Sequence, residues 1–345
     1  MDRDQPLKLP EPFQQLIGGY RAHYGGIKQK IITDGVRTLN EMFTGVRPRK
    51  PGYLSRHNLR QAYVVYYLPV NYAKTRMVLR ELKQFAALPS KPRVLDFGSG
   101  PGTASLAAVD ELDHPQLTLV DIVGEAHTDA EWLLGTYAAG RASFGFKNEV
   151  SGRYDVVLAV NVLAEMRDAS ELRRILETAV EPSGYFILIE PALKETTQRV
   201  QAWRDELAAA GWTIAAPCLG ATRCPLRTSD ELWCHQDLPW KRPAFVDDVD
   251  RRVGLDKQSL QFSYLIITKT GAARPGGWRV VSNAHRAKGR VWMSLCGKDL
   301  IRAELLTRFR SEKTADFEHA RRGDVLTIEP TPTGRLAGES TITRA

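Results

Sequence analysis

A glycine-rich segment at residues 94–103 carries the residues best suited to bind a ligand. An apolar, strand-like stretch ends there and a helix-forming stretch follows. Gly98, Gly100 and Gly102 let the backbone turn tightly and lie close against a bound molecule. A dinucleotide loop would need a glycine where Thr103 stands, and the Gly-Lys-Ser/Thr ending of a P-loop is missing. The spacing therefore predicts a binding loop of a different class.

Two acids accompany this loop. Asp96 ends the strand that leads into the loop. An acid at this position would hydrogen-bond the loop and, in S-adenosylmethionine, the methionine part of the cofactor. Asp121 ends the next expected strand, and a carboxylate there can accept protons from both hydroxyls of a ribose. This order of strand, loop, helix and acid is typical of class I methyltransferases, which bind S-adenosylmethionine (AdoMet). The alternatives are a turn that binds nothing and a nicotinamide enzyme.

The catalytic group is harder to assign. The strand that ends near Asn161 is not followed by the Asn/Asp-Pro-Pro-aromatic turn of amine-methylating enzymes. No cysteine lies between residues 91 and 217, so the nucleophile of enzymes that methylate pyrimidine carbon is missing from the expected sheet. Asn161 and Glu165 are the candidates to line the pocket, and Glu165 could accept a proton. The alternative for Glu165 is a carboxylate that stabilises a helix start.

The chain has four cysteines, and three of them fall close together. Cys218, Cys224 and Cys234 are separated by five and nine residues in a segment rich in Pro and Gly, and Cys296 follows a later strand. Thiolates converging in this way suit zinc or an iron–sulfur cluster, and His235 could replace one of them. The spacing lacks the paired knuckles of a zinc ribbon. Buried cysteines without a ligand are the alternative.

Charge is distributed unevenly over the 345 residues. The net charge is +8, with +9 in residues 1–90, −8 in 91–190 and +6 in 271–345. Two basic ends suggest a polyanion partner, most simply nucleic acid, and an ordinary solvated basic surface is the alternative. Five basic residues between the expected N-terminal helices could contact phosphates, while Tyr53 and His57 could stack on bases. These five are Arg47, Arg49, Lys50, Arg56 and Arg60.

The elements that position these residues follow from apolar periodicity. Residues 12–88 have the spacing of helices. Apolar runs at 93–98, 117–121, 154–163 and 184–191 predict strands, and each is followed by a helical pattern. Alternation of this kind predicts an α/β fold with a doubly wound, mainly parallel sheet.

Five regions follow from this division. We expect a basic helical region at 1–90, an AdoMet-binding Rossmann-like domain at 91–215, and a cysteine-bearing segment with the last sheet strand at 216–270. A small basic β module is expected at 271–330, and a tail at 331–345. No apolar run approaches the roughly 18 residues that a spanning helix needs. The polar start lacks the apolar core of a secretory signal, so we expect a cytoplasmic protein. We also expect a monomer.

Several fragments occur together in one order. They are VLDFGSGPGTA, IEPAL, APC followed by CPL, WCH, FSYLIITK and the late cysteine that follows a strand. Over about residues 90–300 the chain resembles the small-ribosomal-subunit methyltransferase-like family of bacteria and mitochondria. The resemblance implies a class I AdoMet fold that engages small-subunit ribosomal RNA in ribosome assembly or translation. It also implies a 4Fe–4S cluster on Cys218, Cys224, Cys234 and Cys296, with zinc as the alternative.

Three functions remain open at this point. The chain could be an AdoMet-dependent methyltransferase of small-subunit ribosomal RNA, or an assembly factor that keeps AdoMet and the cluster as structural elements. The third is a methyltransferase of small molecules. The basic ends disfavour this third function, because a small substrate needs no segment of net charge +9.

Overall fold

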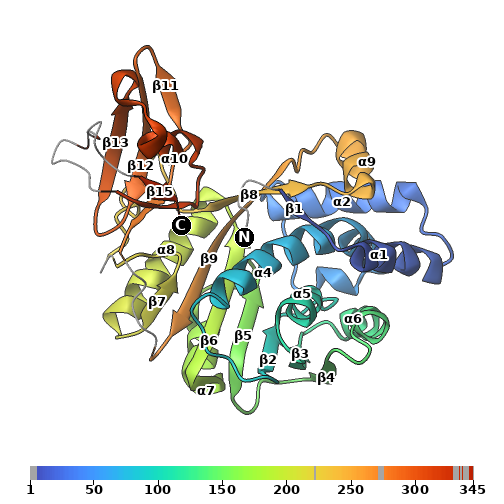
Figure 1. Ribbon diagram of the computed structural model, residues 1–345. Helices are drawn as coiled ribbons and strands as arrows, with labels where there is room; N and C mark the ends of the chain where they lie inside the picture. Colours follow the sequence, from blue (N-terminus) through green and yellow to red (C-terminus); the bar gives the residue numbers. More distant parts are fainter. Residues whose placement is uncertain are drawn as a thin grey trace. The chain divides into compact units, whose positions relative to one another are not determined.

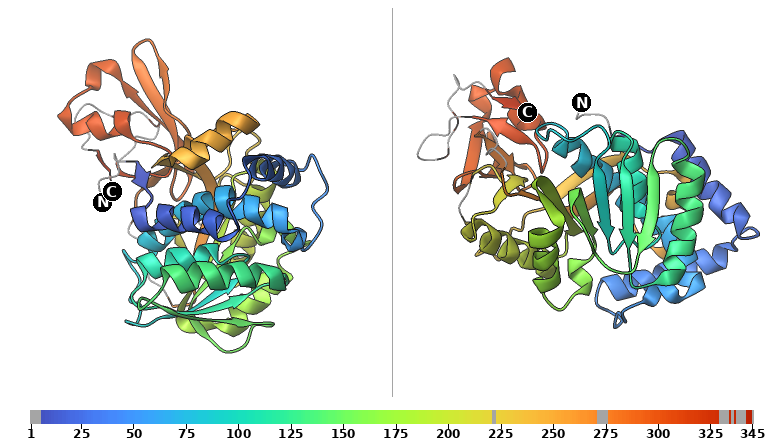
Figure 2. Two further views of the ribbon diagram at one scale, coloured as in Figure 1. Left: turned by 90° about the vertical axis from the view of Figure 1, so that its right-hand side faces the viewer. Right: turned by 90° about the horizontal axis from the view of Figure 1, so that it is seen from below.

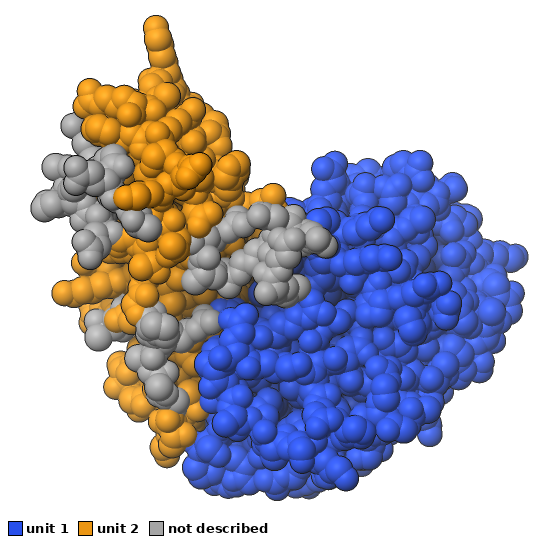
Figure 3. Space-filling view, in the orientation of Figure 1, with its two compact units in different colours: residues 1–189, 238–260 blue, residues 190–237, 261–345 orange. Residues whose placement is uncertain are grey.

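The computed structural model describes residues 6–220, 223–270, 276–328, 334, 336 and 342–344. The chain forms two compact units, coloured separately in Figure 3. Unit 1 comprises residues 1–189 and 238–260, and unit 2 comprises residues 190–237 and 261–345. This division differs from the expected regions, because the N-terminal helices belong to the same unit as the glycine loop.

Unit 1 contains a run of parallel strands in the order β6-β5-β2-β3-β4 (Figures 1 and 2). The bounds are β2 Arg93–Phe97, β3 Gln116–Val120, β4 Ser143–Lys147, β5 Tyr154–Val160 and β6 Val180–Pro191. The two central strands are almost continuously buried, as expected for parallel strands covered on both faces. The strand order reverses between β2 and β5, and ligands bind such sheets at this switch point, beyond the carboxyl ends of the strands.

The connecting helices of this sheet are α5 Thr103–Glu111, α6 Gly124–Tyr137 and α7 Ser170–Ala179, with a short 3-10 turn, η3, at Leu163–Glu165. The alternation of strands and helices agrees with the sequence expectation. Strand β4 was not expected, because it lies at the end of the strand order and its residues are only half-buried or exposed. Its apolar signal is correspondingly weak.

The N-terminal region is helical, as predicted. Its elements are α1 Glu11–His23, α2 Gln29–Phe43, η1 Tyr53–Ser55, α3 His57–Ala62, the π-helix η2 Tyr63–Tyr67 and α4 Leu68–Leu82. Helix α4 packs on α5, α1 packs on α6, and η1 also contacts α6 (Figure 2). Phe13 of α1 stacks on Tyr72 of α4 with ring centroids 3.7 Å apart, and both rings are fully buried. These helices are therefore part of the unit that holds the glycine loop.

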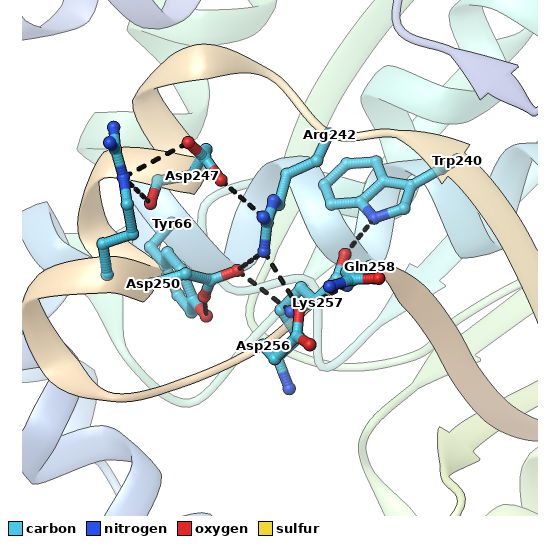
Figure 4. A network of polar contacts seen from close by, with 9 residues as sticks. Tyr66, Trp240, Arg242, Asp247, Asp250, Asp256, Lys257 and Gln258 are labelled. Atoms are coloured by element: carbon cyan, nitrogen blue, oxygen red, sulfur yellow. Dashed lines mark hydrogen bonds and ion pairs between the residues drawn. The ribbon is translucent and has the colours of Figure 1, made fainter.

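Residues 238–260 join unit 1 through a polar network around one buried carboxylate (Figure 4). They include most of β8 Gln236–Lys241 and all of α9 Ala244–Val253. The Asp250 carboxylate, which is 1% exposed, accepts hydrogen bonds from the Tyr66 hydroxyl and from Arg242 at 2.7 Å. Since Tyr66 belongs to the π-helix, this network ties α9 to the N-terminal helices. Strand β8 also pairs in parallel with β1 Leu7–Lys8.

Unit 2 begins with α8 Lys194–Ala209 and β7 Thr213–Ala216, which pairs antiparallel with β9 Ser259–Thr268. A six-stranded sheet follows. Its strands are β10 Trp278–Val280, β11 His285–Ala287, β12 Arg290–Cys296, β13 Leu300–Leu306, β14 Val325–Thr327 and β15 Thr343–Arg344. The strand pairs of this sheet are antiparallel throughout its described residues, which agrees with the expected β module.

The β module has its own apolar core, formed by residues such as Met293, Leu295, Phe317 and Leu326. The short helix α10 Ala315–His319 supplies Phe317. Two described residues of the expected tail, Leu336 and Ile342, also belong to this core, and β15 pairs with β14. The described part of residues 331–345 is therefore packed against the module, while the rest of that stretch lies outside the described residues.

Candidate functional site

The glycine loop has the backbone that its sequence predicts. The φ angles of Gly98, Gly100 and Gly102 are 70°, 49° and 79°, in the left-handed region that favours glycine. A Cβ at Gly98 would lie 2.7 Å from Val162, and one at Gly102 would lie 3.3 Å from Ala130. Glycine is required here for both conformation and space. The loop lies at the carboxyl end of β2, at the switch point of the parallel strands.

Asp96 positions the helix that follows the loop. Its Oδ2 accepts hydrogen bonds from the Ser105 backbone N–H at 2.9 Å and from the Ser105 hydroxyl at 2.7 Å. Burial raises the pKa of the Asp96 carboxyl to about 6, although the hydrogen bonds from Ser105 lower it. The side chain is 1% exposed, so it supports the loop from inside the fold.

Asp121 lies directly beside the loop, as predicted. Its Oδ2 accepts a hydrogen bond from the Gly100 N–H at 2.7 Å, and its Oδ1 accepts one from the Val123 N–H at 2.8 Å. A carboxylate has about four acceptor positions, so each oxygen keeps capacity for one further donor. The pair of ribose hydroxyls in AdoMet would supply two such donors.

The chemistry of the loop fits AdoMet in a second way. The Ser99 hydroxyl is buried and has no hydrogen-bond partner among the residues that the structure describes. A buried hydroxyl without a partner is costly, and a polar ligand in the loop would satisfy it. Gly98, Gly100, Ser99 and Asp121 would hold the ligand, which would supply an electrophilic methyl group.

A segment from the N-terminal region covers the loop. The Leu54 side chain comes within 3.6 Å of the position that a Cβ of Gly100 would occupy. The Tyr53 hydroxyl donates a hydrogen bond to the Glu165 carboxylate at 3.1 Å. Arg49 donates to the Ala164 carbonyl oxygen, and its guanidinium lies 3.5 Å from the same Glu165 carboxylate. We call residues 49–55 the covering segment.

The two candidate catalytic residues lie after β5. Asn161 has a φ of 61°, which is unusual for a residue other than glycine and is often found at functional sites. Glu165 is engaged by the covering segment. Burial raises the pKa of Glu165, while the charge of Arg49 and the hydrogen bond from Tyr53 lower it. In this structure the Glu165 carboxylate therefore anchors the covering segment.

Tyr63 was missed by the sequence analysis. Its hydroxyl accepts a hydrogen bond from the Asn71 amide at 3.1 Å, and burial raises its pKa to about 12. The carboxylates of Glu165 and Asp96 act on its pKa, so the phenol lies near the loop. Tyr63 begins the π-helix, and such wide turns are frequent at functional sites. The sequence shows only an aromatic helical run there.

The five basic residues expected to bind RNA have different surroundings. Lys50 and Arg56 are exposed, and Arg47 is half exposed in an ion pair with Glu41 at 2.7 Å. Arg49 holds the covering segment, as described above. The remaining residue, Arg60, is buried.

Arg60 has a structural role that the sequence did not reveal. It is 6% exposed and forms an ion pair with the fully buried Asp129 at 2.5 Å. It also donates to the backbone carbonyl oxygens of Leu54 at 2.9 Å and Ser55 at 3.1 Å. Its charge is therefore used inside unit 1, where it supports the covering segment, and does not add to an exposed basic surface.

The four cysteines all belong to unit 2. They are half-buried, none of them is joined in a disulfide, and Cys296 ends β12. Burial raises the pKa of Cys224 to about 11 and that of Cys296 to about 12, and in both cases the charge of Cys218 adds to the shift. The pKa of Cys234 rises for the same reasons, with contributions from the other three thiols. The four thiols therefore lie within electrostatic range of one another.

Side chains of unit 2 anchor the backbone around the first three cysteines. Asp205 accepts a hydrogen bond from the Cys224 N–H at 2.8 Å, and the Ser263 hydroxyl donates to the Cys234 carbonyl oxygen at 2.8 Å. The buried Arg279 donates to the carbonyl oxygen of Pro217, directly before Cys218, at 2.8 Å. Across the residues that the structure describes, no three His, Cys, Asp or Glu side chains are arranged to hold a metal ion.

The parallel sheet, the glycine loop and Asp121 define a protein with the class I methyltransferase-like fold, which confirms the expected fold class. The family described as "Mitochondrial small ribosomal subunit Rsm22" matches residues 58–326 of the chain. The chain belongs to this Rsm22 family. A comparison with curated proteins found no match.

Solved structures of methyltransferases align with the chain at low identity. One is a ribosomal protein L11 methylase from Lactobacillus delbrueckii subsp. bulgaricus, with 16% identity, 57% of this chain and 78% of that chain covered, and a TM-score of 0.34. Another is a SAM-dependent methyltransferase from Geobacter sulfurreducens in complex with S-adenosyl-L-homocysteine. It has 13% identity and a TM-score of 0.33, with 56% of this chain and 90% of that chain covered. The mitomycin 7-O-methyltransferase MmcR has 16% identity and a TM-score of 0.39, with 76% of this chain and 74% of that chain covered.

Within the described residues, no helix is long and apolar enough to span a membrane.

Proposed function

We propose that this protein binds AdoMet at the glycine loop and acts on the RNA of the small ribosomal subunit. The observation that carries the AdoMet part is the contact between Asp121 and the Gly100 N–H, at the switch point of the parallel strands. The buried Ser99 hydroxyl supports it. Membership of the Rsm22 family supports the ribosomal target.

The N-terminal region supplies the RNA-binding surface in this proposal. Lys50 lies in the covering segment, Arg47 and Arg56 lie close to its two ends, and all three side chains are exposed. Cations of this kind contact phosphates without reading sequence. Because the covering segment rests on the glycine loop, RNA bound here would lie near the AdoMet site of the same unit.

The surroundings of Glu165 bear on whether this protein transfers a methyl group. Two functions fit: an RNA methyltransferase, and an assembly factor that binds AdoMet without transferring its methyl group. The second is favoured by one observation, because the Glu165 carboxylate is bound by Tyr53 and Arg49. For catalysis, RNA would have to displace the covering segment and release Glu165 as a proton acceptor.

The decisive experiment uses AdoMet labelled in its methyl group and small-subunit particles from a strain that lacks this protein. Label in the RNA supports the methyltransferase. AdoMet binding to the protein–particle complex without label in the RNA supports the assembly factor. If the protein binds the particles with neither outcome, the AdoMet part of the proposal fails.

The RNA surface has its own test. Binding should weaken steeply with salt, because phosphate contacts release counterions. Combined Lys50→Gln and Arg56→Gln substitutions should lower the log–log salt slope on single-stranded RNA by roughly 1.4, at about 0.7 for each cation. The matched control is Lys83→Gln with Lys91→Gln, two exposed lysines of the same unit. Equal slopes in the two double variants would contradict this surface.

We further propose that Cys218, Cys224, Cys234 and Cys296 hold a 4Fe–4S cluster, with zinc as the alternative. Support comes from the electrostatic proximity of the four thiols and from the three anchored backbone groups of the cysteine segment. The proposal requires the thiols to move closer together when the cluster binds, because within the described residues they are not arranged to hold a metal ion. Arg279 lies close enough to Cys234 and Cys296 for its charge to lower the pKa of both thiols. A nearby cation stabilises the thiolates that metal binding requires.

A further inference from the structure

The outer face of the β module has an unusual composition. Along β12, Val291, Met293 and Leu295 are buried in the core of the module. The alternate residues Arg290 and Trp292 point to the opposite face, because side chains alternate along a strand. This face is formed by β11, β12 and β13, which pair in register over the length of β11.

Trp292 is the centre of this face. The His285 ring stacks on its indole, with centroids 5.5 Å apart and an angle of 14° between the planes. The guanidinium groups of Arg302 and Arg290 lie 4.6 Å and 5.1 Å from the indole centroid. Trp292 is half-buried, whereas His285, Arg290 and Arg302 are exposed. The cluster therefore combines stacked planar rings with two cations at the surface of the protein.

The hairpin that carries this cluster is basic throughout. Every residue from 285 to 290 is exposed, and the hairpin extends beyond the rest of its sheet in Figure 1. Its basic residues are His285, Arg286, Lys288 and Arg290. Two acids face the cluster or its edge. Glu304, opposite Trp292, lies 3.3 Å from Arg290 and 3.7 Å from Arg302, and Glu318 lies 3.5 Å from Arg286.

We propose that this face, centred on Trp292, is a binding site for single-stranded RNA. A base extends the stack of Trp292 and His285, and the phosphates contact Arg290, Arg302 and the cations of the hairpin. Aromatic platforms beside guanidinium groups bind single strands in this way, with little dependence on sequence. The choice of RNA rests on the proposed function, whereas the face itself lies in unit 2, apart in sequence from the N-terminal basic residues. An acidic protein would use the cations but would gain little from the ring.

The test measures binding of a fluorescent dodecauridylate to the full-length protein by anisotropy over a range of salt concentrations. Trp292→Ala should weaken binding about tenfold and leave the salt slope unchanged, because stacking of one base is lost without loss of charge. Trp292→Phe should stay within about threefold of the original chain. Arg290→Gln with Arg302→Gln should lower the salt slope by roughly 1.4. The control for charge is Lys313→Gln, an exposed lysine of the same unit outside this face.

Two results would overturn the proposal. One is unchanged affinity in Trp292→Ala, with thermal unfolding showing that the variant is folded. The other concerns polyglutamate as a competitor. If polyglutamate competes with the RNA as strongly as unlabelled dodecauridylate does, and its affinity falls equally in Trp292→Ala, an acidic protein is the partner. Calorimetry with AdoMet on the same variants keeps the two proposals separate. Normal AdoMet binding together with unchanged RNA binding refutes this face alone.

Discussion

The Tyr53 hydroxyl donates a hydrogen bond to the Glu165 carboxylate at 3.1 Å, and so joins the N-terminal region to the turn after β5. Burial raises the pKa of Tyr53 well above its ordinary value, so the phenol remains a donor at neutral pH. Arg49 binds the same carboxylate from the other end of the covering segment. These two contacts join the covering segment to the turn that contains Glu165.

We therefore expect Glu165→Gln to loosen the covering segment. The substitution removes the charge that Arg49 faces and weakens the acceptor for Tyr53, so cleavage by trypsin after Arg49 should become several times faster. Lys50 precedes Pro51 and offers trypsin no site. Glu125→Gln is the control, because Glu125 is an exposed acid in the first turn of α6. Equal cleavage rates in the two variants would show that Glu165 does not hold the segment.

Asp96 should make stability depend on pH. Its folded-state pKa of about 6 lies above the ordinary value of 3.8, so the folded protein binds this proton more tightly than the unfolded chain does. The contribution of this group to stability therefore falls as pH rises from about 4 to about 6, by roughly 2–3 kcal/mol in total.

Asp96→Asn removes this titration while keeping an oxygen that can accept from Ser105. The free energy of unfolding, measured with urea, should therefore rise in the variant relative to the original chain as the pH is raised from 4 to 7. A constant difference across that range would contradict the raised pKa of Asp96.

Arg60 should matter for stability and little for RNA binding. Arg60→Gln leaves the buried Asp129 carboxylate without its ion pair, and breaking a buried pair in this way costs about 3–5 kcal/mol. Arg47→Gln, in an exposed pair with Glu41, should cost less than about 1 kcal/mol. Chemical unfolding of both variants checks this order. Similar losses in the two would mean that the Arg60–Asp129 pair is not buried in solution.

The cysteine site is tested by colour and by proteolysis. Protein purified without oxygen should be brown, with broad absorbance near about 400 nm, if thiolates hold iron. Cys296→Ser should lose this colour and make residues 276–328 more sensitive to protease, because Cys296 links the module to the cysteine segment when a cluster is bound. AdoMet binding by unit 1 should persist.

Other results at this site have clear meanings. Colourless protein with one zinc ion per chain would identify zinc. Colourless, metal-free and well-folded protein after strictly anaerobic purification would contradict both metals, and would leave four half-buried cysteines without a ligand.

The strands of the parallel sheet could be predicted because their burial leaves apolar runs in the sequence, as in residues 154–163. The exposed end strand β4 leaves no such run. The glycine loop and Asp121 were also predictable, since local spacing fixes both. By contrast, the packing of residues 238–260 in unit 1 depends on Asp250 meeting Tyr66, 184 positions away. Periodicity contains no information about such a pair.

The same limit applies to the basic residues. Arg56 and Arg60 are alike in sequence, and both follow the loop after α2. Their surroundings differ because the fully buried Asp129 of α6 pairs with Arg60 and not with Arg56. The covering role of Arg49 and Tyr53 was hidden for a similar reason, because Glu165 lies more than 110 residues further along the chain.

Calorimetric titration with AdoMet tests the central claim most directly. The original chain should bind one AdoMet, and Asp121→Ala should bind at least about a hundredfold more weakly, because two charge-assisted hydrogen bonds of roughly 1.5–3 kcal/mol each are lost. Gly100→Val should abolish binding as well, because a branched side chain is strained at a φ of 49° and would enter the space of the ligand. Glu125→Gln should bind like the original chain, and thermal unfolding should show that each variant is folded. No binding by the original chain, or equal affinity in Asp121→Ala, would contradict AdoMet binding at this loop.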